Sequence, residues 1–348
     1  MMIRKIARLV KLTTISIALF GAASVMDRAS AQTTLQLNFV GQNNDNIDAT
    51  FIRAFAEKVS QMSNGELTIN LNYTSSLVPQ AQAIDAIRSG LIDLHYDSPP
   101  HAAGVIPEVD AYGLLFNFSD HRDLIKKHYV CGMNPIVKEA YLEQGIRLLG
   151  VVPGYGFSMM MTNSKVLSAA DLNGKRIRVV GKALADSVTL LGASPVYIPF
   201  PELEVALDRG TADGFMTGWA NLAFLEGLRR NTKYLVWPPL QGSYATSMIM
   251  SEVKYQALSE EHQKIIQDAF DSISQDYALK LVEDAEGKAR DTVTSAGVEF
   301  TEMSADEQVK WKEKLKPVWD EYLKRAEARS VKNGERAKAI LDILNKGC

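Results

Sequence analysis

Cysteine and histidine are scarce in this chain, which has only two cysteines and five histidines in 348 residues. The cysteine spacing matches neither a metal knuckle nor a redox pair, and no two histidines have the spacing of a zinc-binding helix. There is no Gly-x-Ser-x-Gly turn, and Gly154-Tyr155-Gly156 lacks the rest of a dinucleotide fingerprint. We therefore predict that the chain is not an enzyme and that it uses no metal and no cofactor.

Long apolar runs are also missing, except near the N-terminus. There Leu12–Met26 follows four basic residues between positions 4 and 11 and precedes the small-residue site Ala29-Ser30-Ala31. The run is shorter than the roughly 20 residues of a membrane-spanning helix. We predict that residues 1–31 are a signal peptide, cleaved after Ala31, and that the mature protein is exported to the periplasm.

The mature chain has no basic clusters. The predicted signal peptide carries a net charge of +4, so its removal changes the formal net charge from −3 to −7. A mildly acidic chain of this kind is a poor partner for nucleic acid or for an anionic membrane surface. We predict no nucleic-acid partner.

Both cysteines lie in the mature part. In an oxidising compartment an even number permits one disulfide, here between Cys131 and Cys348. Two unpaired thiols are the alternative, and the sequence does not decide between them.

Strand-like and helical patterns alternate along the first part of the mature chain. Strands are predicted at Leu35–Val40, Leu67–Tyr73 and Leu91–His95, separated by helices at Asp48–Met62 and Gln80–Ser89. This order predicts a parallel sheet with helices on its faces. Further helices are expected within Ser119–Gln144, followed by a strand at Arg147–Val152.

The second half repeats the pattern. We predict strands at Phe157–Thr162, Arg176–Val180 and Pro195–Ile198, with helices at Ala183–Leu191 and Pro201–Arg209. The segments AIRSGLID and ALDRGTAD share a helix end, a glycine and an aspartate that enters the next strand. The chain is therefore expected to form two α/β lobes built on one plan.

An apolar stripe of helical period runs through Ser259–Ala296. A single helix of that length would measure about 55 Å and would span both lobes. Two helices broken near Glu286-Gly287 are the alternative. A strand at Val298–Glu302 and helices at Ala305–Ala328 and Gly334–Asn345 complete the predicted elements.

Polar and aromatic residues follow the predicted strands, where ligands bind in open α/β sheets. The strand ends are rich in amides, hydroxyls and aromatic rings but poor in acid–base pairs, which suits binding an organic molecule. They comprise Gly41–Asn44, Tyr96–Ser98, Gly181–Lys182, Pro199–Phe200 and Phe215–Trp219. The nearest approach to a catalytic or metal cluster is Asp93, His95, Asp97 and His101, for which polar lining of the cleft is the simpler interpretation.

One charged residue interrupts a segment that should be buried. Arg178 lies in the middle of the strand in DLNGKRIRVVG, and a buried guanidinium is costly unless an anion meets it. The anion is either a ligand or a side chain such as Asp186 or Glu202.

These segments resemble the substrate-binding subunit of tripartite ATP-independent periplasmic (TRAP) transporters, the C4-dicarboxylate-binding family. The resemblance covers nearly the whole mature chain and is strongest in DLNGKRIRVVG, LGASPVYIPFPELEVALDRGTADG and LSEEHQKIIQDAF. It implies a two-lobe periplasmic binding protein fold of the α/β class, with a long helix spanning both lobes. It also implies a receptor that binds an organic carboxylate between the lobes and delivers it to a small and a large integral membrane subunit.

The resemblance assigns residues as well. Arg178 matches the arginine that pairs with the ligand carboxylate, and Phe200 matches an aromatic residue of the cleft, with core packing as its alternative. Many members have a second arginine where Ser158 stands, and an amide-containing run where this chain has Phe215-Met216-Thr217-Gly218. If Phe215, Met216, Met159 and Trp219 point inward, the cleft is apolar, which favours a monocarboxylate with an apolar or aromatic body.

The predicted substrate-binding set combines these positions with the strand ends. It consists of Arg178, Ser158, Phe200, Thr217, Phe215, Trp219, Tyr96, Asp97, Asn43 and Tyr244. We predict the chain to be divided into the signal peptide (1–31), lobe 1 (32–154 and 243–281), lobe 2 (155–242 and 282–330) and a C-terminal helix and tail (331–348).

Three other functions are compatible with the sequence. The chain could be the receptor of an ATP-driven importer, a periplasmic partner of a sensor kinase, or an exported hydrolase or lyase that uses the region Asp93–His101.

Overall fold

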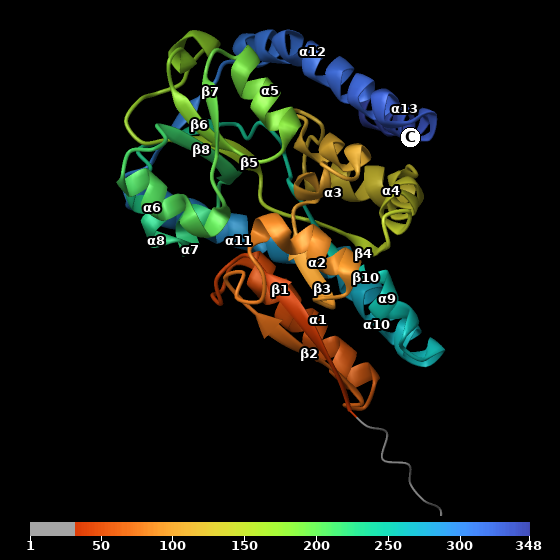
Figure 1. Cartoon of the computed structure of the whole chain (residues 1–348). Coiled ribbons are helices and arrows are strands. Elements are labelled where there is room, and N and C mark those ends of the chain that lie inside the picture. Colours follow the sequence, from red (N-terminus) through yellow and green to blue (C-terminus); the bar gives the residue numbers. More distant parts are fainter. Residues whose placement is uncertain (1–31) are drawn as a thin grey trace, which may run out of the picture. The chain divides into compact units, whose positions relative to one another are not determined.

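The strands form two separate sheets (Figure 1). The computed structural model describes residues 32–348, so the predicted signal peptide and its cleavage site lie outside the described part. The two sheets confirm the predicted mixed α/β class with two lobes. No helix described in residues 32–348 combines the length and apolarity needed to cross a membrane.

The first sheet has the order β2-β1-β3-β10-β4. Strand β1 (Thr33–Phe39) pairs in parallel with β2 (Leu67–Asn72) and β3 (Leu94–Asp97). Strand β10 (Ala245–Ser251) lies antiparallel between β3 and β4 (Ile146–Pro153). Its first residues therefore lie at the edge where β3 and β4 end.

The second sheet has the order β11-β9-β5-β8-β6-β7. Its parallel strands include β6 (Arg176–Val179), β7 (Ser194–Tyr197) and β8 (Gly214–Gly218). Strand β5 (Phe157–Met161) is antiparallel to β8 and to β9 (Tyr234–Trp237), while β11 (Glu299–Glu302) extends the sheet beyond β9. Each sheet thus contains one antiparallel strand that begins where its neighbours end.

Strands β8, β9 and β10 were not predicted, and β3 is shifted from its predicted position. The sequence predicted Leu91–His95, whereas the strand forms at Leu94–Asp97. Helix α2 (Ala83–Ser89) ends in the left-handed residue Gly90, and a turn then occupies the next residues. The shift places Asp97 at the end of β3.

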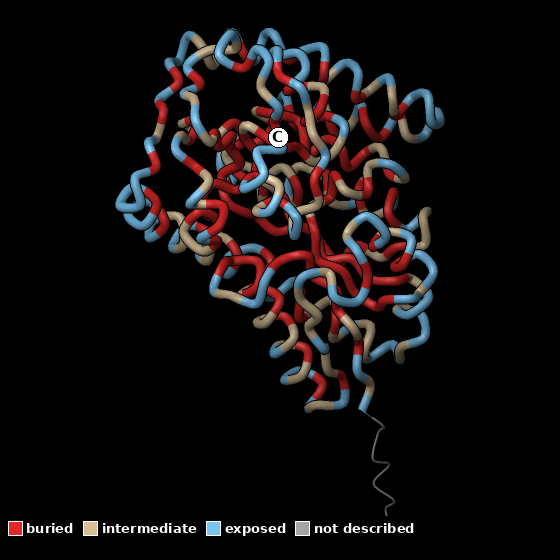
Figure 2. Tube along the Cα trace, turned by 60° about the vertical axis from the view of Figure 1, so that its left-hand side comes forward, coloured by how far each residue is buried: buried red, intermediate tan, exposed pale blue. Residues whose placement is uncertain are grey.

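The buried residues gather in the interior of the molecule (Figure 2), and apolar faces of the helices cover both sheets. Helix α1 (Ile47–Met62) and helix α10 (Glu260–Ser274) pack on one face of the first sheet. Helices α6 (Leu203–Asp208), α7 (Asn221–Phe224) and α8 (Glu226–Arg230) pack on the second. The remaining faces share a core with α2, α4 (Met133–Leu142) and α5 (Lys182–Leu190).

The predicted long helix is interrupted at Gln275, whose backbone angles of φ −109° and ψ −87° are not helical. Helix α10 ends at Ser274, and helix α11 runs from Asp276 to Ser295. The alternative break near Glu286-Gly287 is wrong, because both residues lie inside α11. Helix α10 packs on α1 of the first lobe and α11 packs on α7 of the second, so the pair spans both lobes.

Two further segments cross between the lobes, and they pair with each other. The first connects β4 to β5, and the second connects β9 to β10. Gly154 N donates to Tyr244 O at 2.7 Å, and Tyr244 N donates to Tyr155 O at 3.0 Å. A Cβ atom on Gly154 would lie 2.5 Å from the Tyr244 ring, so this position requires glycine. The crossing segments thereby fix the Tyr244 ring at the junction.

A helical hairpin closes the chain, as predicted. Helix α12 (Ala305–Arg329) packs on α5, and helix α13 (Val331–Lys346) packs on α4. Cys131 and Cys348 form a disulfide across a sequence separation of 217 residues. The bond ties the end of α13 to the segment between α4 and the π-helix Lys126–Val130, which follows α3 (His121–Ile125).

We predict that breaking the disulfide destabilises the protein by about 2–5 kcal/mol, because the bond closes a very long loop in the unfolded chain. Cys131→Ser, Cys348→Ser and the double variant should show the same lowered melting temperature in a thermal unfolding experiment. A reducing agent should affect the parent protein and leave the variants unchanged. Equal melting temperatures for the parent with and without reductant would contradict the prediction.

Candidate functional site

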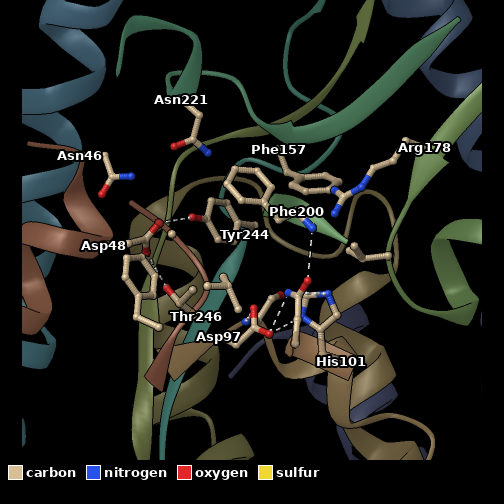
Figure 3. Close-up of a pocket in the computed structure, with 16 residues that line it drawn as sticks. Asn46, Asp48, Asp97, His101, Phe157, Arg178, Phe200, Asn221, Tyr244 and Thr246 are labelled. Atoms are coloured by element: carbon tan, nitrogen blue, oxygen red, sulfur yellow. Dashed lines mark hydrogen bonds and ion pairs between the residues drawn. The ribbon is translucent and has the colours of Figure 1, made fainter. Parts of the chain in front are cut away.

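A cavity of about 80 Å³ lies between the two lobes, at the carboxyl ends of the parallel strands. The residues that line it come from both sheets and from the helices that follow them (Figure 3). They are Phe39, Val40, Gly41, Asn46, Asp48, Gln80, Asp97, Ser98, His101, Phe157, Arg178, Val180, Phe200, Asn221, Tyr244 and Thr246.

Arg178 brings a buried positive charge to the cavity. It stands on β6 and is only 3% exposed. Its Nε donates to Ile198 O at 2.9 Å and its Nη1 donates to Met216 O at 3.2 Å. Among residues 32–348 no carboxylate lies within 4.0 Å of the guanidinium. Burial lowers the pKa of Arg178 to about 10, an effect that the charge of Asp97 opposes.

The neutral carbonyls therefore orient the guanidinium without neutralising it. Two of its five N–H groups are used, and the others have no acceptor in the described part of the chain. The possible side-chain partners from the sequence, Asp186 and Glu202, do not pair with it; Asp186 instead binds Arg325 at 2.8 Å. An anion that enters the cavity would complete the charge pair.

Asp48 brings a buried negative charge. It lies in the first turn of α1, where the helix dipole favours a carboxylate, and its N-cap residue Asn46 accepts from Ala49 N at 2.8 Å. The carboxylate accepts from the hydroxyls of Tyr244 at 2.9 Å, Tyr96 at 3.2 Å and Thr246 at 3.4 Å. Burial nevertheless raises the pKa of Asp48 to about 6, because these donors only partly offset the loss of hydration.

Asp97, the second carboxylate of the cavity, is compensated by neighbouring groups. Its Oδ2 lies 2.9 Å from His101 Nδ1 and 3.6 Å from His95 Nε2, and it accepts from Gln80 Nε2 at 3.0 Å. Burial alone would raise the pKa of Asp97, but the charge and hydrogen bonds of the two histidines outweigh it and lower the pKa well below its usual range.

Aromatic rings form the walls between the charged groups. Phe157 begins β5, Phe200 follows β7, and Tyr244 precedes β10. The guanidinium carbon of Arg178 lies 5.9 Å from the centre of the Phe200 ring. Figure 3 shows Arg178 and Asp48 on opposite sides of the view, with these three rings between them.

The two lobes touch directly at this cavity. Phe200 N donates to Gln80 Oε1 at 3.3 Å, while the amide nitrogen of Gln80 holds Asp97. One side chain of the first lobe thus bonds to the backbone of the second beside the binding surface.

The structure brings four of the predicted site residues to the cavity: Arg178, Phe200, Asp97 and Tyr244. Tyr96 lies behind the wall, where its hydroxyl supports Asp48. Whether these residues contact a ligand stays a prediction.

The other five predicted residues do not line the cavity. Ser158 donates to Val236 O at 2.5 Å, and Thr217 accepts from Asn221 Nδ2 at 3.5 Å. Phe215 and Trp219 belong to the core of the second lobe, where Trp219 packs against Trp237 and Phe300. Asn43 accepts from Arg53 at 3.0 Å.

The four residues that were expected to make the cleft apolar do not line it. Met159 and Met216 are fully buried core residues, as are Phe215 and Trp219. The apolar character of the cavity comes from Phe157, Phe200 and Tyr244 instead.

Sequence reasoning missed the polar residues at the starts of elements. Asn46 and Asp48 begin α1, Asn221 begins α7, and Thr246 lies near the start of β10. The capping pattern of Asn46 before a helix was a usable signal for the first pair. No pattern marked Thr246, because the antiparallel course of β10 is a property of the sheet.

The region Asp93–His101 does not assemble as one cluster. Asp93 accepts from Gln36 N at 2.7 Å and lies 3.3 Å from Lys254 Nζ, whereas Asp97 and His101 face the cavity. Within residues 32–348 no three side chains of the metal-ligating types converge on a common point.

A family model described as bacterial extracellular solute-binding protein, family 7 (DctP) matches residues 39–325. The chain belongs to this family. The ectoine-binding periplasmic protein TeaA of Halomonas elongata is 22% identical over 303 residues, which cover 85% of this chain and 84% of that protein. The C4-dicarboxylate-binding periplasmic protein DctP of Rhodobacter capsulatus is 25% identical over 281 residues, which cover 80% and 83%.

Solved structures of TRAP periplasmic solute-binding proteins share the fold. A TRAP periplasmic solute-binding protein from Desulfovibrio salexigens, crystallised with bound orotic acid, superimposes with a TM-score of 0.80. The two are 20% identical, and the match covers 90% of this chain and 97% of that one. The predicted family and fold are confirmed. Family members are receptors rather than enzymes, so the hydrolase alternative is not favoured. The similarity to TRAP receptors does not favour the receptor of an ATP-driven importer either.

We predict that Asp48→Asn stabilises the ligand-free protein at neutral pH. The folded state holds the Asp48 proton more tightly than the unfolded chain, so the parent loses stability as the pH rises from about 4 to about 6. The loss is up to about 3 kcal/mol and stays constant above that range. The variant should lack it, and denaturant unfolding at several pH values measures the difference.

Asp45→Asn is the matched control, because it removes an exposed carboxylate three residues earlier. Its stability should differ from that of the parent by a pH-independent amount. Parallel stability curves for Asp48→Asn and the parent would show that Asp48 carries no such cost.

Proposed function

We propose that this protein is a periplasmic receptor that captures an organic monocarboxylate between its lobes and delivers it to the membrane subunits of a TRAP transporter. The observation that carries the proposal is the guanidinium of Arg178, which is 3% exposed, lines the cavity and has no carboxylate partner among residues 32–348. A carboxylate matches the fork of an arginine and would form charge-assisted hydrogen bonds with the free N–H groups.

The relatives support a carboxylate as the ligand class. DctP of Rhodobacter capsulatus is described as a C4-dicarboxylate-binding protein, and the structure from Desulfovibrio salexigens contains orotic acid. Among residues 32–348, Arg178 is the one arginine that lines the cavity, together with the carboxylates of Asp48 and Asp97. A second ligand carboxylate would meet negative charge, so a monocarboxylate is favoured over a dicarboxylate.

The mechanism that we propose is closure of the lobes around the ligand. Arg178 and Phe200 belong to the second lobe, whereas Asp48, Asp97 and Thr246 belong to the first. A ligand that touches both groups stabilises the closed state by contacts that are absent from the open state. The Gln80–Phe200 hydrogen bond would form only in the closed state, and motion would occur at the paired crossing segments and at Gln275.

The N-terminal sequence supports cleavage after Ala31, and the family supports a periplasmic location and the two membrane partners. They are part of the proposal. So is the division into lobes of residues 32–154 with 243–281 and 155–242 with 282–330.

We predict that Arg178→Ala weakens carboxylate binding by about 10- to 150-fold for each charge-assisted bond lost, since one such bond contributes about 1.5–3 kcal/mol. Isothermal titration calorimetry with carboxylates found in a thermal-shift screen would measure it. Arg176→Ala is the matched control, because Arg176 stands on the same strand but is exposed and pairs with Asp213 at 2.9 Å. Equal affinity in the Arg178 variant and the parent would contradict the proposal.

A further inference from the structure

The cavity contains two buried charges of opposite sign that the described part of the protein leaves unpaired. Asp48 is 8% exposed and Arg178 is 3% exposed. Among residues 32–348 no cationic side chain lies within 4.0 Å of Asp48, whose partners are hydroxyl groups. Both residues line the same cavity and come from different lobes.

The other ionisable side chains of the cavity do not supply the missing partners. Asp97 Oδ2 lies 2.9 Å from His101 Nδ1, so these two side chains pair with each other. Arg178 donates to two carbonyls, and Asp48 accepts from Tyr244, Tyr96 and Thr246. A carboxylate has about four acceptor positions, and these hydroxyls supply at most three donors, so there is room for at least one more.

Burying an unpaired carboxylate costs free energy, and an uncharged side chain in the same place would avoid that cost. A ligand cation would recover it. The rings of Phe157 and Tyr244 also line the cavity, and aromatic faces attract cations. The Asp48 end of the cavity is thus suited to a positively charged group.

We propose that the ligand is an amino carboxylate, a zwitterion whose carboxylate binds Arg178 and whose protonated nitrogen binds Asp48. This inference rests on the proposed function and specifies its substrate class. Asp48 selects for the nitrogen and against a second carboxylate, and Asn46 and Asn221 offer further polar contacts at the cavity wall. The aromatic walls accommodate the carbon body between the two charged ends.

The test compares ligands that differ by one functional group. The probes are ω-amino acids of three to six carbons, fatty acids of equal length that lack the amine, and the dicarboxylates of equal length. A rigid pair, 4-(aminomethyl)benzoate and 4-methylbenzoate, suits the aromatic walls. Isothermal titration calorimetry at pH 7.5 gives the affinity of each probe for the purified protein, for Asp48→Asn, for Asp45→Asn and for Arg178→Ala.

We expect the best amino carboxylate to bind the parent at least about tenfold more tightly than its amine-free partner, the effect of one charge-assisted bond. In Asp48→Asn this preference should fall below about twofold, and dicarboxylate binding should improve. Asp45→Asn should keep the preference of the parent. Unchanged or higher melting temperature of Asp48→Asn would exclude misfolding as the cause.

Two contrary results are distinguishable. If amine-free carboxylates bind as tightly as amino carboxylates and still depend on Arg178, the inference is wrong and the proposed function stands. If no probe depends on Arg178, both are wrong. Failure of every amino carboxylate to bind with a Kd below about 1 mM, while another carboxylate binds, would also overturn the inference.

Discussion

Residues 32–348 hold the guanidinium of Arg178 out of water without placing a carboxylate within 4.0 Å of it. Neutral carbonyls of Ile198 and Met216 fix its direction, and they leave the charge to be met by whatever enters the cavity. Such an arrangement is unfavourable for folding but favourable for binding, because the carbonyls that orient the arginine do not compete for its charge. Asp48 is a second buried charge, of opposite sign, and its hydrogen-bond partners are likewise uncharged, namely three hydroxyl groups. The two lobes therefore present charges of opposite sign to the same cavity.

The topology of the sheets explains how these groups meet. Parallel strands deliver Arg178 and Asp97 at their carboxyl ends, and each crossing segment starts an antiparallel strand at the same edge. Tyr244 lies in one of these segments, against Gly154 in the other, and its hydroxyl reaches Asp48. The polar support of the binding surface is thus part of the junction on which the lobes would move. The residues that would move on closure therefore also arrange the site.

The alternation of strands and helices was enough to predict the two lobes, and one charged residue in an apolar strand was enough to identify Arg178. The other residues of the cavity wall were harder to predict, because the sequence at the end of a strand does not indicate which side chain faces the cavity. Phe215 lies in β8 and Trp219 follows it directly, yet both pack into the core. Asp48 was missed because an aspartate in a first helical turn has an ordinary explanation in the helix dipole. Only its distance from any cation, a property of the tertiary structure, sets it apart.

The central claim is that Arg178 is the carboxylate anchor of the cleft. A crystal structure of the protein with its tightest-binding carboxylate tests it most directly. If Arg178 is the anchor, the ligand carboxylate will lie within hydrogen-bond distance of its guanidinium, with the carbon body between Phe157, Phe200 and Tyr244. A ligand whose carboxylate lies elsewhere, or an Arg178 that pairs with a carboxylate of the protein itself in the bound state, would contradict the account.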